Sequence, residues 1–190
     1  MIKAFRPLFT VFLFLSSLAY AEVTTVPKVD LKLYLGKWFE VASIPQSFQR
    51  QCVSNTSAEY SEAEPGLIKV LNSCDTEDGS RSVAEGRAKV VDEQSNAKLK
   101  VTFVKFIDWI FAFGGAYWII DLAPDYSYAL VGDPSAKYAW ILSRSPQLTP
   151  EVYRKAEAKF RSQGYDTCQI LTSVQSGGNG SRTPLCQIVK

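Results

Sequence analysis

The feature that most constrains the fold is a series of short segments, between Trp38 and Arg144, in which apolar and polar residues alternate. The segment AKLKVTFVK, residues 97–105, is the clearest, because its apolar residues share one face and its lysines the other. Alternation with a period of two indicates strands that have one buried and one solvated face. The pattern predicts eight strands, at residues 37–44, 53–61, 67–73, 81–91, 97–105, 116–122, 126–132 and 137–144.

Eight such strands can close into a barrel, which removes the exposed edges of an open sheet. We therefore expect an all-β protein built on an eight-stranded antiparallel up-and-down β-barrel. After the strands, Thr149-Pro150-Glu151 has the sequence of a helix start and Gly164 that of a stop, which predicts an α-helix over 150–163. Its apolar stripe should pack against the outside of the barrel, and a last strand is expected at 168–174.

The first 21 residues have the pattern of a secretory signal peptide. Lys3 and Arg6 precede an apolar stretch, and Ala19-Tyr20-Ala21 is a small-x-small cleavage sequence. The stretch is short of the roughly 20 residues that a membrane-spanning helix needs. No cysteine follows the expected cut for lipid attachment, so we expect a soluble protein in the periplasm or outside the cell. The expected organisation is a signal peptide at 1–21, a barrel domain at 22–176 and a flexible Gly/Ser-rich tail at 177–190, tied back by Cys186.

Charge and composition exclude several functions. Loss of Lys3 and Arg6 with the signal would make the basic residues equal in number to the 19 acidic ones. The remaining chain would then lack the excess of positive charge that is typical of nucleic-acid-binding proteins. The chain has no histidine, which excludes Ser-His-Asp and Cys-His catalysis and the usual imidazole metal sites. We expect no metal, no cofactor and no catalytic residue.

The four cysteines, an even number behind a signal peptide, predict disulfides. If the strands around Glu64-Pro65-Gly66 form a hairpin in which paired residue numbers sum to 126, Ala58 faces Ile68 and Cys52 faces Cys74. The preferred pairing is therefore Cys52–Cys74 with Cys168–Cys186. Cys52–Cys186 with Cys74–Cys168 is the main alternative.

Three ordered motifs resemble those of the lipocalins: Gly36-Lys37-Trp38, PDYSYALVG at 124–132 and AWILSR at 139–144. The similarity runs from Leu31 to about Gln175 and is greatest to the bacterial lipocalins and apolipoprotein D. In that family the motif tryptophan lies across the closed end of the barrel, beneath an arginine from the last barrel strand. The resemblance thus implies a structural floor made by Gly36, Trp38, Asp125, Tyr126 and Arg144.

Parity along the strands, counted from Trp38 and Arg144, gives a set of side chains expected to line the interior. The resemblance supports Asn72, Trp118 and Trp140, because apolipoprotein D has an asparagine and two tryptophans at matching positions around its cavity. An ordinary packed core is the alternative interpretation. Glu40 is costly to bury unless Arg144, Tyr60 or a water molecule satisfies it. The candidate ligand contacts are Glu40, Ala42, Ala58, Tyr60, Val70, Asn72, Phe103, Trp118, Tyr138 and Trp140.

We expect a protein that binds, transports or stores a small amphipathic lipid such as a fatty acid or lysophospholipid. The alternatives are an enzyme acting on a lipid or isoprenoid, with Glu40 as its acid, and a protein-interaction module that uses the loops at the open end. FIDWIFAFGG, residues 106–115, is more apolar than a solvated loop requires and should form part of the rim. Membrane contact is expected to be transient if present, and the protein to be a monomer or dimer.

Overall fold

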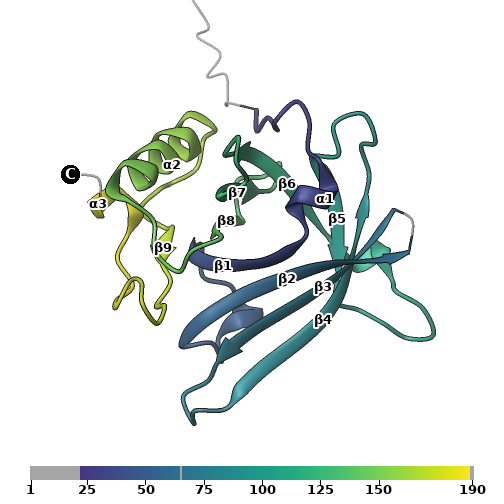
Figure 1. Ribbon diagram of the computed structural model, residues 1–190, viewed down its shortest axis with the longest axis horizontal. Helices are drawn as coiled ribbons and strands as arrows, with labels where there is room; N and C mark the ends of the chain where they lie inside the picture. The colour runs from purple at the N-terminus through teal and green to yellow at the C-terminus, as the bar shows by residue number, and fades with distance from the viewer. Residues whose placement is uncertain (1–21, 65, 189–190) are drawn as a thin grey trace, which may run out of the picture.

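The computed structural model describes residues 22–64 and 66–188, so the predicted signal peptide lies outside the described residues. A single antiparallel sheet has the strand order β2-β3-β4-β5-β6-β7-β8-β1-β9, and pairing of β2 with β1 closes strands β1 to β8 into a barrel (Figure 1). The strands are β1 (Gly36–Ser43), β2 (Ser54–Glu64), β3 (Leu67–Asp75), β4 (Arg81–Val90), β5 (Lys98–Thr102), β6 (Gly115–Leu122), β7 (Tyr128–Gly132), β8 (Ala139–Ser143) and β9 (Leu171–Thr172). The expected eight-stranded barrel is therefore confirmed.

Several strands are shorter than expected, among them β7, which begins at Tyr128, and β9, and for β5 and β8 the local reason is clear. β5 ends at Thr102 because its hydroxyl donates to Ile110 O and accepts from Val104 N, which turns the chain out of the sheet. β8 begins at Ala139 because the Asp133 carboxylate accepts hydrogen bonds from backbone amides of the preceding loop, including Tyr138 N. Polar side chains that bond nearby backbone in this way compete with strand pairing.

The register of the first hairpin differs from the expected one. Ala58 pairs with Asn72 and Tyr60 with Val70, so residue numbers sum to 130 and not 126, because Glu64 already pairs with Leu67 across a tight connection. The shift is an even number, and the same side chains therefore still share a face. An irregularity between Ser54 and Ser57 compensates at the far end of the hairpin. The Cys52–Cys74 disulfide consequently forms despite the wrong predicted register.

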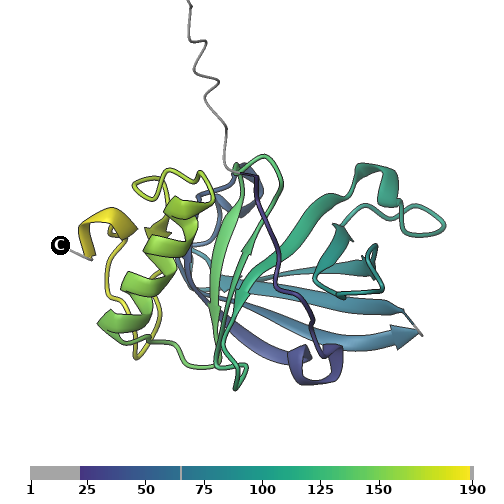
Figure 2. The ribbon, with the colours of Figure 1, turned by 90° about the horizontal axis from the view of Figure 1, so that it is seen from above.

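Two hydrophobic clusters occupy the two faces of the barrel wall. One lies inside the barrel and contains Trp38, Tyr60, Val70 and Leu142 among its members. The other lies between the outer wall and helix α2 (Pro150–Ser162), on which Tyr153, Ala156 and Phe160 are buried. The Thr149 hydroxyl accepts a hydrogen bond from Val152 N and begins this helix at the predicted place. Figures 1 and 2 show α2 on the outside of the barrel.

The chain after α2 runs back along the barrel wall. Its strand β9 pairs with β1, and Gln175 Nε2 donates to both Glu40 O of β1 and Thr56 O of β2. Helix α3 (Leu185–Ile188) then packs beside α2, with Leu185 fully buried and a second disulfide joining Cys168 to Cys186. The described part of 177–190 is therefore hydrogen-bonded and packed, in place of the flexible tail that its Gly and Ser content suggested.

The closed end carries helix α1 (Leu31–Tyr34), and the open end carries four connections, at 44–53, 76–80, 103–114 and 133–138. Two of these connections include short 3-10 helices, η1 (Ser47–Gln49) and η2 (Phe111–Phe113). Among the described residues, no helix is both long enough and apolar enough to cross a membrane.

Candidate ligand-binding barrel

The closed end of the barrel is sealed by Trp38 and Arg144. The Arg144 Cζ lies 3.7 Å from the centroid of the fully buried Trp38 ring. Its guanidinium also donates hydrogen bonds of 2.8 Å to the backbone oxygens of Leu33, Leu35 and Lys37. Gly36 has φ of 91°, and a Cβ there would lie 3.4 Å from Arg144 Nη1. The pair thus ties α1 and the start of β1 to the end of β8.

Two further floor residues stand in the connection between β6 and β7. The Asp125 carboxylate accepts from Ser127 N, and Tyr126 has φ of 59° with its hydroxyl accepting from Asp30 N. Asp30 in turn caps α1 through hydrogen bonds from Lys32 N and Leu33 N. The expected set of floor residues is therefore brought together at one end of the barrel.

Three tyrosines stand above this floor. The Tyr117 hydroxyl lies 2.8 Å from that of Tyr34 and 3.0 Å from that of Tyr60. Burial raises the pKa of Tyr60 to about 12 and the pKa values of Tyr34 and Tyr117 well above 10, so all three are neutral at ordinary pH. Two hydrogen bonds use two of the three hydroxyl hydrogens, which leaves one without a partner within this cluster.

The lumen wall above the tyrosines is apolar with a single amide. Ala58 and Val70 are buried there, and Asn72 extends from β3 on the same face. Asn72 Oδ1 is the one buried side-chain oxygen or nitrogen of the described residues without a hydrogen-bond partner. Nearer the open end, the Trp140 ring stacks on that of Tyr138, with ring centroids 6.1 Å apart.

Phe103 lies across the lumen face of β4, because Gly86 leaves room for it. A Cβ built on Gly86 would be 2.8 Å from the Phe103 ring and 2.7 Å from Thr102 O, closer than atoms normally approach. The Phe103 side chain remains 42% exposed at the open end. It therefore lies at the mouth of the lumen.

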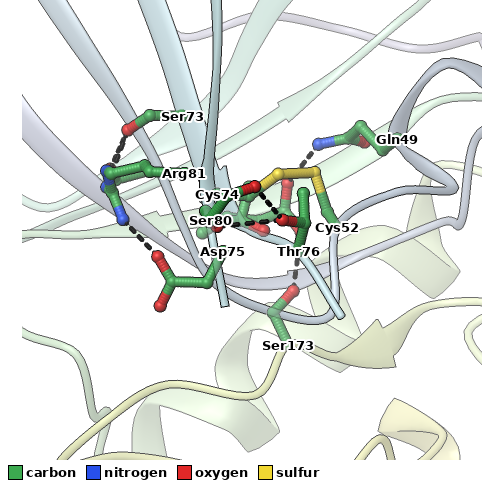
Figure 3. The surroundings of a disulfide bond; sticks show 12 residues. Gln49, Cys52, Ser73, Cys74, Asp75, Thr76, Ser80, Arg81 and Ser173 are labelled. Carbon is green, nitrogen blue, oxygen red and sulfur yellow. Dashed lines mark hydrogen bonds and ion pairs between the residues drawn. A yellow bond between two sulfur atoms is a disulfide. The ribbon is translucent and has the colours of Figure 1, made fainter. Parts of the chain in front are cut away.

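Glu40 is buried, and its partners differ from those expected. Its carboxylate accepts hydrogen bonds from Ser43 Oγ at 2.9 Å, Gln49 Nε2 at 3.0 Å and Ser173 Oγ at 2.6 Å. Arg144 and Tyr60 do not bond to it. Figure 3 shows Gln49 and Ser173 reaching this region beside the Cys52–Cys74 disulfide. Glu40 thus joins β1 to the 44–53 connection and to the chain after β9.

A cavity of about 200 Å³ lies next to Glu40, between the end of β1, residues 45–54 and residues 171–174. It sits where β1 leaves β2, at the side of the open end. Arg50 and Arg182 also line it. Its lining is therefore more polar than the wall of the lumen.

Two candidate contacts, Ala42 and Trp118, lie outside the lumen, and the prediction for them was wrong. The register of β1 shifts between Glu40 and Ala42, so Ala42 turns to the outer cluster and Ser43 to the side of Trp140. In the first half of β6 the inner side chains are Tyr117 and Ile119, and Trp118 lies on the outer face with Lys98 Nζ 4.5 Å from its ring centroid.

Sequence reasoning missed Tyr34 and Tyr117. Tyr117 could have been found from the strand 97–105, because Leu99 is on its apolar face and pairs with Tyr117. Tyr34 precedes the first motif by two residues and carries no alternation signal, since it belongs to α1. No group of three or more potential metal-binding side chains occurs in residues 22–64 and 66–188.

A closed barrel with an apolar lumen, a sealed floor and an unpaired buried amide oxygen defines a class of proteins that bind small hydrophobic molecules. The chain belongs to the lipocalin family, since a family model described as a lipocalin-like domain matches residues 29–175. Membership indicates binding or transport of a small hydrophobic ligand.

Named relatives agree with this assignment. The chain is 38% identical to temperature-induced lipocalin-1 of Arabidopsis thaliana, covering 82% of this chain and 84% of the relative. It is 36% identical to the outer membrane lipoprotein Blc of Vibrio cholerae, with 79% and 85% covered, and 38% identical to rat apolipoprotein D, with 77% of each covered. Insecticyanin of the tobacco hornworm has a similar fold, with a TM-score of 0.65 at 23% identity over 86% of this chain and 93% of that one.

Proposed function

We propose that the protein carries a small amphipathic lipid, such as a fatty acid or lysophospholipid, in the barrel lumen. The observation that carries the proposal is unpaired hydrogen-bonding capacity inside an apolar lumen, at Asn72 Oδ1 and at one hydroxyl of the tyrosine cluster. Buried polar atoms are costly without partners, and the polar group of a lipid can supply them. The apolar wall of the lumen would bury the hydrocarbon chain of the lipid.

The proposed contacts are those predicted residues that face the lumen or its mouth. Apolar contact comes from Phe103, Tyr138 and Trp140 near the open end, and from Ala58 and Val70 deeper inside. Tyr60 and Asn72 would orient the polar group, together with Tyr34 and Tyr117. Glu40 is proposed as a polar contact at the side of the mouth. Its carboxylate accepts hydrogen bonds there from three side chains of the protein.

The same hydrogen bonds argue against an enzyme. A general acid needs a proton to transfer and access to the reacting group, whereas the Glu40 carboxylate accepts from Ser43, Gln49 and Ser173 and thus acts as a structural acceptor. The relatives named above are lipocalins or lipoproteins. We accordingly propose a carrier without catalytic activity, as a monomer or dimer.

Displacement of a fluorescent fatty acid from delipidated protein, by free fatty acid or by lysophospholipid, tests the proposal. Trp140→Leu should weaken binding, and Trp118→Leu is the matched control because that tryptophan lies outside the lumen. Asn72→Leu should cost about 1 kcal/mol, a roughly fivefold rise in Kd, if the amide bonds the lipid. The proposal fails if the folded protein binds neither lipid, or if Trp118→Leu weakens binding as much as Trp140→Leu.

We also propose that the carrier is exported and acts in solution in the periplasm or outside the cell. Two disulfides and the signal-like sequence of residues 1–21 support an oxidising compartment. The Vibrio relative is named a lipoprotein, but this chain has Glu22 where a lipid-attachment cysteine would follow the cut. N-terminal sequencing of the exported protein should begin at Glu22, and an uncleaved chain in the cytoplasm would contradict the proposal.

A further inference from the structure

The connection Phe103–Phe113 at the open end, here called the rim loop, exposes large apolar side chains. Phe106 is 83% exposed, Ile107 88% and Phe113 73%. Figures 1 and 2 both place this connection on the side of the barrel opposite α2, projecting away from the wall. Exposed apolar groups gathered in one loop indicate a contact surface, whereas single ones are ordinary.

Hydrogen bonds fix the rim loop in a shape that holds these side chains outward. Lys105 and Trp109 form an antiparallel bridge, and Ile110 N donates to Val104 O at 2.9 Å. Thr102 Oγ1 anchors the returning strand through Ile110 O at 3.0 Å. Phe106 and Ile107 therefore form the tip of a small hairpin, and their exposure is a property of a bonded structure.

Basic side chains lie beside the base of the rim loop, at Trp109 and Phe111. Arg87 Cζ and Lys105 Nζ lie 4.6 and 5.2 Å from the Trp109 ring centroid, and Lys89 Nζ lies 4.7 Å from that of Phe111. Lys89 is also directly opposite Lys100 on the paired strands β4 and β5. Like charges in this position repel each other unless an anion lies between them.

These cations are poorly neutralised within the protein. Arg87 pairs with Glu85, but Lys89, Lys100 and Lys105 make no salt bridge with any residue in 22–64 or 66–188. Asp108 is the one acidic residue of the rim loop. A loop with an apolar tip and excess positive charge behind it, at its base, is complementary to a surface with an anionic layer above a hydrocarbon layer.

We propose that the rim loop docks the open end of the barrel onto a phospholipid bilayer that contains anionic lipids. Phe106 and Ile107 insert among the acyl chains, Trp109 lies at the interface, and Lys89, Lys100 and Lys105 contact headgroup phosphates. The contact is reversible, because it uses two inserted side chains and no covalent lipid. The inserted side chains, Phe106 and Ile107, do not include the proposed lumen contact Phe103, so docking does not depend on which ligand the lumen holds.

Vesicle co-sedimentation of residues 22–190, which contain every described strand and helix, tests the proposal without interference from the apolar segment 1–21. Vesicles of phosphatidylcholine with phosphatidylglycerol should retain the protein. Phe106→Ser/Ile107→Ser should lower the partition coefficient about tenfold or more, since both side chains leave the hydrocarbon. Leu33→Ser/Val91→Ser is the matched control, because it removes two exposed apolar side chains at the closed end.

A separate variant tests the contribution of the lysine charges to vesicle binding. Lys89→Gln/Lys100→Gln should weaken binding to the vesicles with phosphatidylglycerol severalfold and leave binding to pure phosphatidylcholine unchanged. Equal binding of this variant and the unmodified protein to both vesicles would refute the role of the lysines.

Failure of vesicle binding by the unmodified protein, or undiminished binding by Phe106→Ser/Ile107→Ser, would overturn the proposal. A dimer that this double variant dissociates, without vesicle binding, would assign the rim loop to a second copy of the chain and would also overturn it. Fatty acid displacement by the same variant reports on the lumen separately, so that loss of docking and loss of ligand binding are distinguishable.

Discussion

One guanidinium group holds the floor of the barrel together. Arg144 covers the Trp38 ring and bonds three backbone oxygens at 2.8 Å, from α1 and from β1. Only a planar group with several fixed donors can stack and bond in this way at once. The sequence motifs were sufficient to predict this pair, because both residues lie inside them. The Trp118 prediction was supported by the resemblance and was wrong, because Tyr117, paired with the inward Leu99, is the side chain of this strand that faces the lumen.

Arg144→Lys should therefore destabilise the barrel although it keeps the charge. The lysine cannot reproduce the stack or the three hydrogen bonds, and we expect the free energy of unfolding to fall by about 2 to 4 kcal/mol. Chemical denaturation measures the loss. Arg154→Lys, on the exposed side of α2, is the control and should change stability little. Equal stability of the two variants would contradict the role assigned to Arg144.

The tyrosine cluster predicts a loss of stability in alkaline solution. Burial raises the pKa of Tyr60 to about 12, whereas an unfolded tyrosine ionises near 10. The unfolded chain therefore releases its protons first, so the cluster stabilises the fold fully below pH 10 and progressively less as the pH rises toward 12. Denaturation at several pH values measures this slope. The fall in stability with pH should be less steep in Tyr60→Phe. An unchanged slope in that variant would refute the contribution of Tyr60 to the alkaline loss of stability.

At the scale of elements, the hairpin of β2 and β3 marks the limit of prediction from sequence. Strand positions follow from alternation, but the register depends on the length of the connection, and turn residues at Glu64 to Gly66 allow several lengths. Because the predicted register was wrong by an even number of residues, the side chains predicted to face the lumen still do so. The irregularity between Glu40 and Ala42 has no sequence signal, and it moved Ala42 to the outer face.

The disulfide at the open end of this hairpin should stabilise the 44–53 connection. It joins Cys52 to Cys74 across 22 residues, beside Gln49 and its hydrogen bond to Glu40 (Figure 3). Cys52→Ser/Cys74→Ser should lower the free energy of unfolding by about 2 to 4 kcal/mol. Hydrogen exchange should accelerate in 44–53. Cys168→Ser/Cys186→Ser is the control, and in this variant hydrogen exchange should accelerate only in the chain around α3. Faster exchange at 44–53 in this control variant would contradict a specific stabilisation of the 44–53 connection by Cys52–Cys74.

At the scale of the whole molecule, a barrel, an outer helix and a sealed floor could be predicted, whereas the course of the chain after α2 could not. Ser173, Gln175 and Thr172 are polar, and their contribution comes from hydrogen bonds to distant strands. Such contacts leave no periodic pattern in the sequence. Similarly, the apolar rim loop was visible in composition, but its outward direction required the structure.

The course of the chain after α2 has a consequence for synthesis. Ser173 N donates to Val41 O, and Gln175 bridges β1 and β2 across separations of 135 and 119 residues, so these early strands are completed by residues translated much later. A nascent chain on the ribosome lacks these partners until Gln175 has left the exit tunnel. Strands β1 and β2 therefore emerge long before the barrel can be completed, and during that interval they are exposed without their last hydrogen-bond partners.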